Sequence, residues 1–243
     1  GGQSKEATVL FSDIRGFTTL TEELGAQGTV QLLNEYFTIM VDCIQAEGGM
    51  LDKFIGDGIM IFFGDPKTKG TKRDALACVS MAIEMRNHMQ VLRQRWADQG
   101  ISSPLQVRMG ISTGYCTVGN FGTESRMDYT IIGKEVNLAS RLETEATPGE
   151  ILISQDTYTL IKDRIDCRSR GKAVVKGFRD PIPTFQVIDY LSQADSDEIN
   201  QMSHEGEGYS LHIDQERIAE EDRDRIADEL ERAARRLRGK QVA

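Results

Sequence analysis

The 243-residue chain lacks several features that would assign it to a particular class of protein. It has no apolar run approaching the ~20 residues of a transmembrane helix, so we expect neither a membrane span nor a signal peptide. Basic residues are not in excess, because the formal net charge is −9, and we expect no binding to nucleic acid. The chain begins Gly-Gly-Gln without methionine, which suggests a fragment. An upstream membrane or sensor domain is compatible with that start.

Cysteine and histidine are also scarce and scattered. The three histidines and four cysteines show no Cys-x-x-Cys spacing and no pattern of zinc ligands. Free thiols are typical of a reducing compartment, where cysteines pack as small hydrophobic side chains. We therefore expect a cytoplasmic protein, which includes the cytoplasmic part of a larger, membrane-associated one. The four cysteines are Cys43, Cys78, Cys116 and Cys167.

Charge divides the chain into two parts. Residues 191–243 hold 14 acidic and 8 basic residues, a net charge of −6, which leaves −3 for residues 1–190. We expect residues 1–190 to form one globular domain and residues 191–243 to form an acidic linker, at 194–208, and an amphipathic helix. The helix is expected over residues 215–238, with Asp214 as its N-cap and a short strand at 209–213 before it.

A predicted hairpin organises the first part. Two apolar, β-rich runs at residues 51–55 and 59–63 flank Gly56-Asp57-Gly58, and Asp-Gly between such runs is a strong hairpin signal. An isolated Asp57 would simply make the turn. A carboxylate at the tip of a buried hairpin is costly without a partner, however, and a metal ion is such a partner.

The order of predicted elements gives the fold class. A strand at residues 7–12 is followed by a helix ending at Gly48, with Thr19 or Thr21 as its cap, then by the hairpin and a second helix. This β–α–β–β–α–β order predicts an α+β, ferredoxin-like antiparallel sheet with helices on one face. The methionines of the second helix are expected in the core. The second helix is expected at residues 74–99, and further helices are expected at 133–145 and 157–162. Further strands are expected at residues 105–113, 115–118, 128–132, 151–154, 167–175 and 184–190.

In this topology the first and third strands are central neighbours. Asp13 ends the first strand and Asp57 sits at the hairpin tip, so the two carboxylates should meet and form a hard-oxygen site for Mg²⁺ or Mn²⁺. Gly16, Phe17 and Thr18 lead into a helix start whose free N–H groups can hold a polyphosphate.

A second constellation follows Thr130 and Gly133. Asn137 and Arg141 are four residues apart and therefore share one helix face. Such a pair alone is more often a solvated face. Beside a metal and phosphate site, an amide can orient a sugar and an arginine can meet a charged phosphorus centre.

The chain resembles the catalytic domain of class III nucleotidyl cyclases of the bacterial adenylate cyclase type, over about residues 5–190. Four blocks carry the resemblance, in the family's order and spacing. They are Phe-Ser-Asp-Ile-Arg-Gly-Phe-Thr at 11–18, Lys-Phe-Ile-Gly-Asp-Gly at 53–58, Tyr-Thr-Ile-Ile-Gly at 129–133 and Asn-Leu-Ala-Ser-Arg at 137–141.

The resemblance implies roles for the metal and base sites. Asp13, Asp57 and the backbone carbonyl of Ile14 resemble the ligands of two Mg²⁺ or Mn²⁺ ions. Lys53 and Thr130 resemble the pair that selects the purine, although many animal adenylate cyclases carry aspartate where Thr130 stands. The family's guanylate cyclases carry an acidic residue in place of Lys53.

The resemblance also implies which residues contact the phosphates of the substrate, and it implies a partner chain. Asn137 and Arg141 resemble the transition-state pair, and Lys176 of Val-Lys-Gly-Phe at 175–178 resembles the triphosphate lysine. Lys172 lies nearby and is the alternative. Substrate contacts are also expected from the turn at Phe17 and Thr18. In this family the carboxylates and the remaining groups come from different chains of a head-to-tail dimer, so a homodimer would have two equivalent sites.

The expected function is an adenylate cyclase that converts ATP into 3′,5′-cyclic AMP and pyrophosphate. A cyclase-like module that binds nucleotide without turnover is the alternative from another class, but this chain retains the metal carboxylates and the Asn–Arg pair that such modules usually lack. A guanylate cyclase is opposed by Lys53. A diguanylate cyclase would show a Gly-Gly-acidic-acidic hairpin, which this chain does not have.

Overall fold

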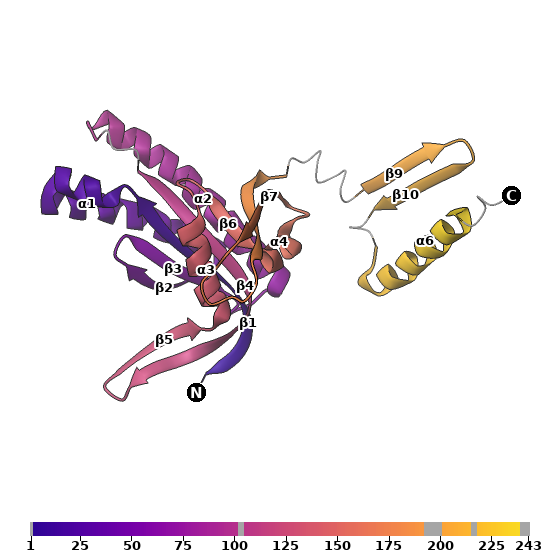
Figure 1. Cartoon of the computed structure of the whole chain (residues 1–243), viewed down its shortest axis with the longest axis horizontal. Helices are drawn as coiled ribbons and strands as arrows, with labels where there is room; N and C mark the ends of the chain where they lie inside the picture. Colours follow the sequence, from indigo (N-terminus) through magenta and orange to yellow (C-terminus); the bar gives the residue numbers. More distant parts are fainter. Residues whose placement is uncertain (1, 102–104, 192–200, 215–217, 239–243) are drawn as a thin grey trace. The chain divides into compact units, whose positions relative to one another are not determined.

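The structure is a computed structural model that describes residues 2–101, 105–191, 201–214 and 218–238. The chain divides into two compact units, residues 1–190 and residues 191–243, each of which is described by itself (Figure 1). None of the helices in the described part of the chain combines the length and apolarity that a membrane span needs.

The first unit alternates strands with helices. Its elements, in chain order, are β1 (Gln3–Arg15), α1 (Phe17–Glu47), β2 (Met50–Ile55), β3 (Gly58–Phe63), α2 (Thr71–Asp98), β4 (Gln106–Thr123), β5 (Arg126–Ile132), α3 (Lys134–Glu145), β6 (Ile151–Ser154), α4 (Gln155–Ile161), β7 (Ile165–Ala173) and β8 (Ile182–Tyr190).

One sheet carries all of these strands. Its order is β2-β3-β1-β4-β6-β8-β7, and β5 pairs with the far end of β4. The first four strands have the predicted ferredoxin-like order, with β1 and β3 side by side. The sheet departs from the prediction at one pair, because β4 and β6 run parallel. The two strands predicted on either side of Gly114 are a single strand, β4, in which Gly114 pairs with Ala7 of β1.

The strand alternation separates two apolar faces. Leu10 and Ile61 belong to the larger core, together with residues of α1, α2 and α4. Val9 and Phe62, their neighbours in sequence, belong to a second cluster with Ala139 of α3. The two helices of the predicted β–α–β–β–α–β core, α1 and α2, therefore lie on one face as expected, and the additional helix α3 covers the opposite face (Figure 1).

Gly110 of β4 allows α3 to lie directly on the sheet. A Cβ at this position would stand 2.2 Å from the backbone oxygen of Ala139 and 2.2 Å from the backbone nitrogen of Glu143. Real Cβ atoms do not approach so closely, so only glycine fits here. This close approach brings the end of α3 to the strands that carry the predicted metal ligands.

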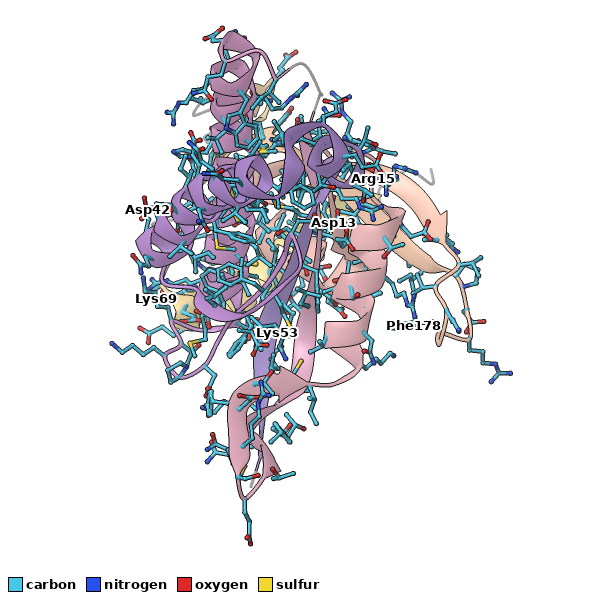
Figure 2. All side chains as sticks on the ribbon, turned by 90° about the vertical axis from the view of Figure 1, so that its left-hand side faces the viewer. Asp13, Arg15, Asp42, Lys53, Lys69 and Phe178 are labelled. Carbon is cyan, nitrogen blue, oxygen red and sulfur yellow. The ribbon has the colours of Figure 1, made fainter. Side chains whose placement is uncertain are left out.

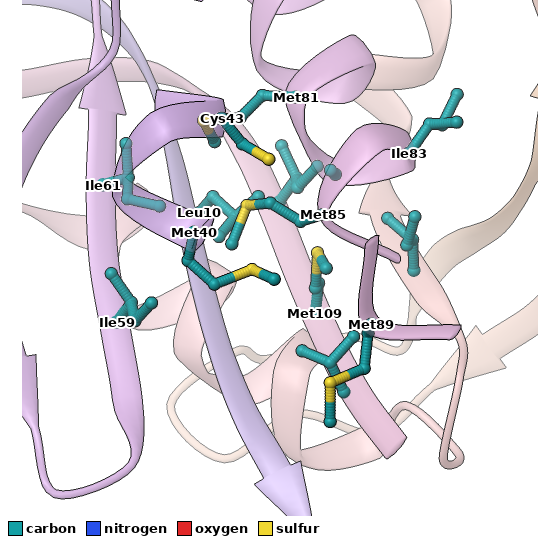
Figure 3. Packing of buried hydrophobic residues seen from close by; sticks show 14 of the residues in the cluster. Leu10, Met40, Cys43, Ile59, Ile61, Met81, Ile83, Met85, Met89 and Met109 are labelled. Atoms are coloured by element: carbon teal, nitrogen blue, oxygen red, sulfur yellow. The ribbon is translucent and has the colours of Figure 1, made fainter. Parts of the chain in front are cut away.

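Methionines fill the core between the helices and the sheet. Met81, Met85 and Met89 of α2 are buried, as the sequence predicts, and Figure 3 shows them near Met40 of α1 and Met109 of β4. Their flexible side chains fit the irregular space between two long helices and a twisted sheet.

Helix α1 starts differently from the prediction. Gly16 precedes it in a left-handed conformation, with φ of 85°, and no side chain caps the first turn. Thr21 instead donates its hydroxyl to the carbonyl oxygen of Thr18 within the helix. The expected cap at Thr19 or Thr21 is therefore wrong. The end of the helix at Gly48 is as predicted, and Gly25 interrupts the helix with φ of 68°.

The second unit contains a hairpin, of which the sequence predicts one strand, at residues 209–213, and not the other. Strands β9 (Gln201–Gly206) and β10 (Tyr209–Asp214) pair antiparallel, followed by the 3₁₀ turn η1 (Glu220–Asp222) and helix α6 (Arg223–Arg238). The predicted linker at 194–208 thus includes a strand, and its residues 194–200 lie outside the described residues. Asp214 ends β10 and caps no helix, because α6 begins at Arg223 rather than at residue 215.

Candidate active site

Of the two predicted carboxylates, one lies near the end of β1 and the other in the turn of the β2–β3 hairpin. The turn consists of Gly56 and Asp57, since Ile55 pairs with Gly58, and Gly56 has the positive φ, 61°, that a type II′ turn requires at its first loop position. Asp57 Oδ2 accepts a hydrogen bond of 2.8 Å from the backbone N–H of Ile14, the residue that follows Asp13. Both carboxylates therefore lie at the same edge of the sheet, as the prediction requires.

The hairpin approaches β1 closely at this edge. A Cβ on Gly58 would lie 3.0 Å from the carbonyl oxygens of Ser12 and Ile55 and 3.9 Å from Cβ of Asp13. Glycine at this position therefore lets the turn carry Asp57 alongside the end of β1.

An arginine that the sequence analysis missed holds Asp13. In the β1–β4 register Asp13 faces Arg108, whose Nε and Nη2 donate to the two carboxylate oxygens at 2.9 and 3.1 Å. Arg108 Nε also lies 2.8 Å from Oε1 of Glu143, near the end of α3, and Nη1 donates to the carbonyl oxygen of Thr144. Arg108 thus joins the metal edge of the sheet to α3.

The carboxyl groups of Asp13 and Glu143, which both contact Arg108, differ in their pKa values. Burial of Asp13 opposes ionisation, but the hydrogen bonds from Arg108 and Glu143 hold the pKa of the Asp13 carboxyl below its usual value. Burial, a hydrogen bond with Asp13 and the charge of Asp13 raise the pKa of Glu143 to about 7. Of these two acids, Asp13 is therefore the one that loses its proton at the lower pH.

The residues at this edge fit a divalent cation. Asp13 and Asp57 supply two carboxylates and Ile14 a backbone carbonyl, which are the hard oxygen donors that Mg²⁺ and Mn²⁺ prefer. The side chain of Asp13 is still 31% exposed, and an ionised carboxylate has about four lone-pair sites, so Arg108 does not exhaust it. In the described part of the chain no cluster of three or more His, Cys, Asp or Glu side chains offers a rival metal site.

A second group of predicted residues gathers around α3. Asn137 and Arg141 line one cavity of 590 Å³ together with Lys176, which follows β7. Lys172, the alternative to Lys176, lies on β7 in register with Pro183 and does not line this cavity. The other lining residues are Lys134, Ser140, Gly177 and Phe178.

This cavity is suited to polyanions. Its lining includes three cationic side chains, Lys134, Arg141 and Lys176, and no acidic residue. The ammonium group of Lys134 lies 4.8 Å above the ring centroid of Phe178, a cation–π contact that ties the start of α3 to the segment carrying Lys176. Fixed cations with no acidic neighbour in the lining can bind phosphates without first breaking an ion pair.

Lys53 and Thr130 come from two strands that contact each other, β2 and β5. Lys53 Nζ lies 3.3 Å from Oδ2 of Asp52. The Asp52 side chain is only 1% exposed and makes no hydrogen bond, so Lys53 is its nearest compensating charge. Thr130 pairs with Gly119 of β4. Neither Lys53 nor Thr130 lines the α3 cavity.

Phe17 and Thr18 begin α1, directly after the metal edge. The Phe17 side chain packs partly against the large core, whereas Thr18 is exposed. Since no side chain caps this helix end, the backbone N–H groups of its first turn are available to an anion.

The predicted residues therefore form separate groups on one chain. Asp13 and Asp57 stand at one edge of the sheet, and the cavity that contains Asn137, Arg141 and Lys176 includes neither carboxylate. Figure 2 shows Asp13, Lys53 and Phe178 at distinct positions on the ribbon. The cavity beside α3 therefore holds Asn137, Arg141 and Lys176 and is not lined by the other predicted groups.

Residues 2–189 match the family described as the adenylate and guanylate cyclase catalytic domain. The chain belongs to this class III cyclase family. It is a nucleotidyl cyclase catalytic domain, and the family generally uses divalent metals. The predicted fold class is thereby confirmed, together with the resemblance on which the expected function was based.

Solved cyclases share the fold of this domain. The structure of the adenylyl cyclase CyaB from P. aeruginosa is 59% identical, with a TM-score of 0.77, and the match covers 80% of this chain and 98% of that one. The guanylyl cyclase Cya2 is 37% identical, with a TM-score of 0.72 over 79% of this chain and 96% of that one. These two similar structures are thus an adenylyl cyclase and a guanylyl cyclase.

Curated relatives are much longer than the cyclase domain. The terminal-differentiation specific adenylate cyclase of Dictyostelium discoideum is 36% identical over 191 residues, which is 76% of this chain and 9% of that protein. Adenylate cyclase 1 of Rhizobium meliloti is 30% identical over 187 residues, 76% of this chain and 28% of that protein. The chain therefore spans less than a third of the length of either relative.

Proposed function

We propose that this domain is an adenylate cyclase that converts ATP into 3′,5′-cyclic AMP and pyrophosphate at sites shared between two copies of the chain. The observation that carries the proposal is the separation of two complementary half-sites. The acidic edge at Asp13 and Asp57 suits metal ions, and the cationic cavity beside α3 suits phosphates. In a head-to-tail homodimer each acidic edge faces the other chain's cavity, which gives two equivalent sites.

The metal ions would be held by Asp13, Asp57 and the carbonyl of Ile14. When bound there, two Mg²⁺ or Mn²⁺ ions lower the pKa of the attacking hydroxyl and neutralise the leaving phosphates. Asp57 is positioned for this role by the Ile14 N–H, and Asp13 by Arg108. These contacts fix both carboxylates before substrate arrives, so little reorganisation is needed.

The reaction is an intramolecular phosphoryl transfer. The ribose 3′-oxygen forms a bond to the α-phosphorus and gives its proton to water, while the bond from the α-phosphorus to the bridging oxygen breaks and pyrophosphate leaves. Asn137 orients the ribose, and Arg141, one helical turn later, meets the charge that develops on the α-phosphate. Lys176 holds the β- and γ-phosphates within the same cavity.

Base choice is assigned to Lys53 and Thr130. Adenine presents an acceptor at N1 and donors at its 6-amino group, which a lysine donor and a threonine oxygen can match. Guanine presents the reverse polarity at both positions. A guanylate cyclase is the second candidate, because the 37% identical Cya2 is a guanylyl cyclase and the hydroxyl of Thr130 can either donate or accept.

Product analysis with ATP and GTP in parallel, each with Mg²⁺ or Mn²⁺, tests this function. Cyclic AMP should be the main product. An excess of cyclic GMP over cyclic AMP would support the second candidate. The absence of any cyclic nucleotide from either substrate would favour a binding module without turnover.

Mixing two inactive variants tests the shared site. Asp13→Ala and Asn137→Ala chains should each lack activity, whereas their mixture contains dimers with one intact composite site. For two freely exchanging chains mixed equally, half of the dimers are mixed and each has one of two sites, so about a quarter of wild-type activity is expected. An inactive mixture with demonstrated chain exchange would refute the shared site.

A further inference from the structure

Helix α6 of the second unit carries an apolar stripe with heptad spacing. Ile226, Leu230, Ala233 and Leu237 follow one another at intervals of four, three and four residues, the a/d pattern of a two-helix seam. Leu230 is 37% exposed and Leu237 is 76% exposed. The helix has 16 residues, and helices of this length are marginal in water without a packing partner.

Charge is distributed unequally along this segment. Residues 220–231 contain seven acidic residues and two arginines, whereas residues 232–238 contain four arginines and no acidic residue. A helix with an acidic first half and a basic second half is complementary to itself when the second copy runs in the opposite direction.

We propose that α6 pairs antiparallel with α6 of a second copy of the chain. The heptad pattern gives the register, because the numbers of the apolar a and d residues that face each other sum to 463. Ile226 then packs on Leu237 of the second copy, and Leu230 packs on its Ala233. All four apolar positions are covered, and the two-fold relation produces each contact twice.

The flanking charges fit the same register. With Leu230 and Leu237 at position a, Glu229 and Arg236 occupy successive g positions, and g positions face each other in an antiparallel pair. Glu229 then faces Arg236 of the second copy, and Arg236 faces its Glu229. Within its own helix Glu229 pairs with Arg225 at 3.5 Å, but its side chain is 58% exposed, so the carboxylate is accessible to a second helix.

A parallel pair fits less well. It would place Glu229 opposite Ala234, at an e position, and Arg223 opposite Arg223 of the second copy at an a position. The acidic first halves would also lie together. The sequence therefore favours the antiparallel arrangement by charge as well as by packing.

This pairing does not depend on the proposed catalytic reaction. Where two cyclase domains associate, the chain tethers one α6 to each of them, which raises the effective concentration of the helices for each other. The helix pair would then stabilise the dimer without contributing an atom to the active site.

Cysteine cross-linking of the full chain tests the pairing. One chain carries Leu230→Cys and another Ala233→Cys, and the unmodified chain reports any background from its four native cysteines. Under mild oxidation the mixture should form a disulfide-linked dimer several-fold faster than either variant alone. If each variant alone formed the disulfide-linked dimer as fast as the mixture does, the helices would pair in parallel and the proposal would be overturned. No linking above background would overturn it in favour of a helix that docks on its own chain.

Charge reversal tests the ion pairs in the same assay. Glu229→Arg turns two attractive contacts into repulsive ones, and Arg236→Glu does the same, so each should slow cross-linking about tenfold. The chain with both changes exchanges the partners and should recover the original rate. Both variants keep the apolar stripe, so a failure of the double variant to recover would refute the register.

Discussion

Replacing Asp57 with asparagine separates metal binding from the structural role of this side chain. Asparagine retains an oxygen that can accept the 2.8 Å hydrogen bond from the Ile14 N–H, but it lacks the negative charge that a divalent cation requires. Alanine removes both. The two variants should therefore lose activity together and differ in stability.

The hydrogen bond sets the expected difference in stability. A bond to a charged group contributes ~1.5–3 kcal/mol, and the bond to a neutral acceptor ~1 kcal/mol. Asp57→Ala should lose most of the first amount, and a loss of ~1.5–3 kcal/mol lowers the melting temperature by about 3–12 °C in a domain of this size. Asp57→Asn should lose less, because its amide oxygen can still accept the hydrogen bond from the Ile14 N–H.

Activity should respond alike to both variants. A metal ion contributes several kcal/mol to the transition state, so loss of one of its two carboxylates should reduce cyclic AMP formation by at least ~10²-fold at fixed Mn²⁺. The measurements are initial rates over a series of Mn²⁺ concentrations and thermal unfolding without metal. Asp163→Asn is the matched control, since Asp163 only pairs with the exposed Lys72.

Two results would contradict this reasoning. Near-normal turnover by Asp57→Asn would show that the Asp57 carboxylate holds no metal. Equal destabilisation by asparagine and alanine would show that the contact with Ile14 does not hold the hairpin tip.

Three further substitutions test other parts of the site. In steady-state kinetics Arg141→Ala should reduce turnover by ~10²–10³-fold with a small change in KM for ATP. The control Arg73→Ala, which changes an exposed arginine of α2, should leave turnover and KM unchanged. If the two variants lowered turnover equally, the role of Arg141 would be refuted. Lys53→Glu should raise the ratio of kcat/KM for GTP to that for ATP by about tenfold or more, because it replaces a donor with an acceptor; an unchanged ratio would remove Lys53 from base selection. Gly110→Ala should destabilise the domain by ~3 kcal/mol or more in urea unfolding, since its Cβ would meet the α3 backbone at 2.2 Å; unaltered stability would show that α3 can move away from β4.

The central strands and the hairpin could be predicted from sequence because their signals are local. Gly56, Asp57 and Gly58 interrupt two apolar runs, and the β–α–β–β order then places β1 beside β3. The position of Asp13 relative to Asp57 follows from these two facts alone. Their roles as metal ligands remain a prediction that rests on the family and on the donor atoms.

Arg108 and Glu143 could not be found in the same way. Asp13 and Arg108 are 95 positions apart in sequence and meet only through the β1–β4 register. An arginine among alternating apolar residues of the predicted strand at 105–113 is the single local signal, since a buried cation needs an acidic partner. The position of α3 depends on the missing side chain of Gly110, which no helical pattern reveals.

The second unit was misread for a different reason. The linker prediction relied on the polar, acidic composition of residues 194–208, but β9 lies within this range and pairs with β10. Polar composition without periodicity does not exclude a hairpin, because backbone hydrogen bonds between two strands need no apolar side chains. The Asp214 cap failed because β10 continues through that residue.

The β2–β3 hairpin bears on the proposal that the active site is shared between two chains. Lys53 and Asp57 lie four residues apart on one hairpin, and a lysine in the same site as a metal carboxylate would compete with the cation for it. The structure directs them to different neighbours, Lys53 to Asp52 and Asp57 to Ile14. Because each of the two side chains has its own partner on this chain, we infer that they work in opposite sites of the proposed dimer.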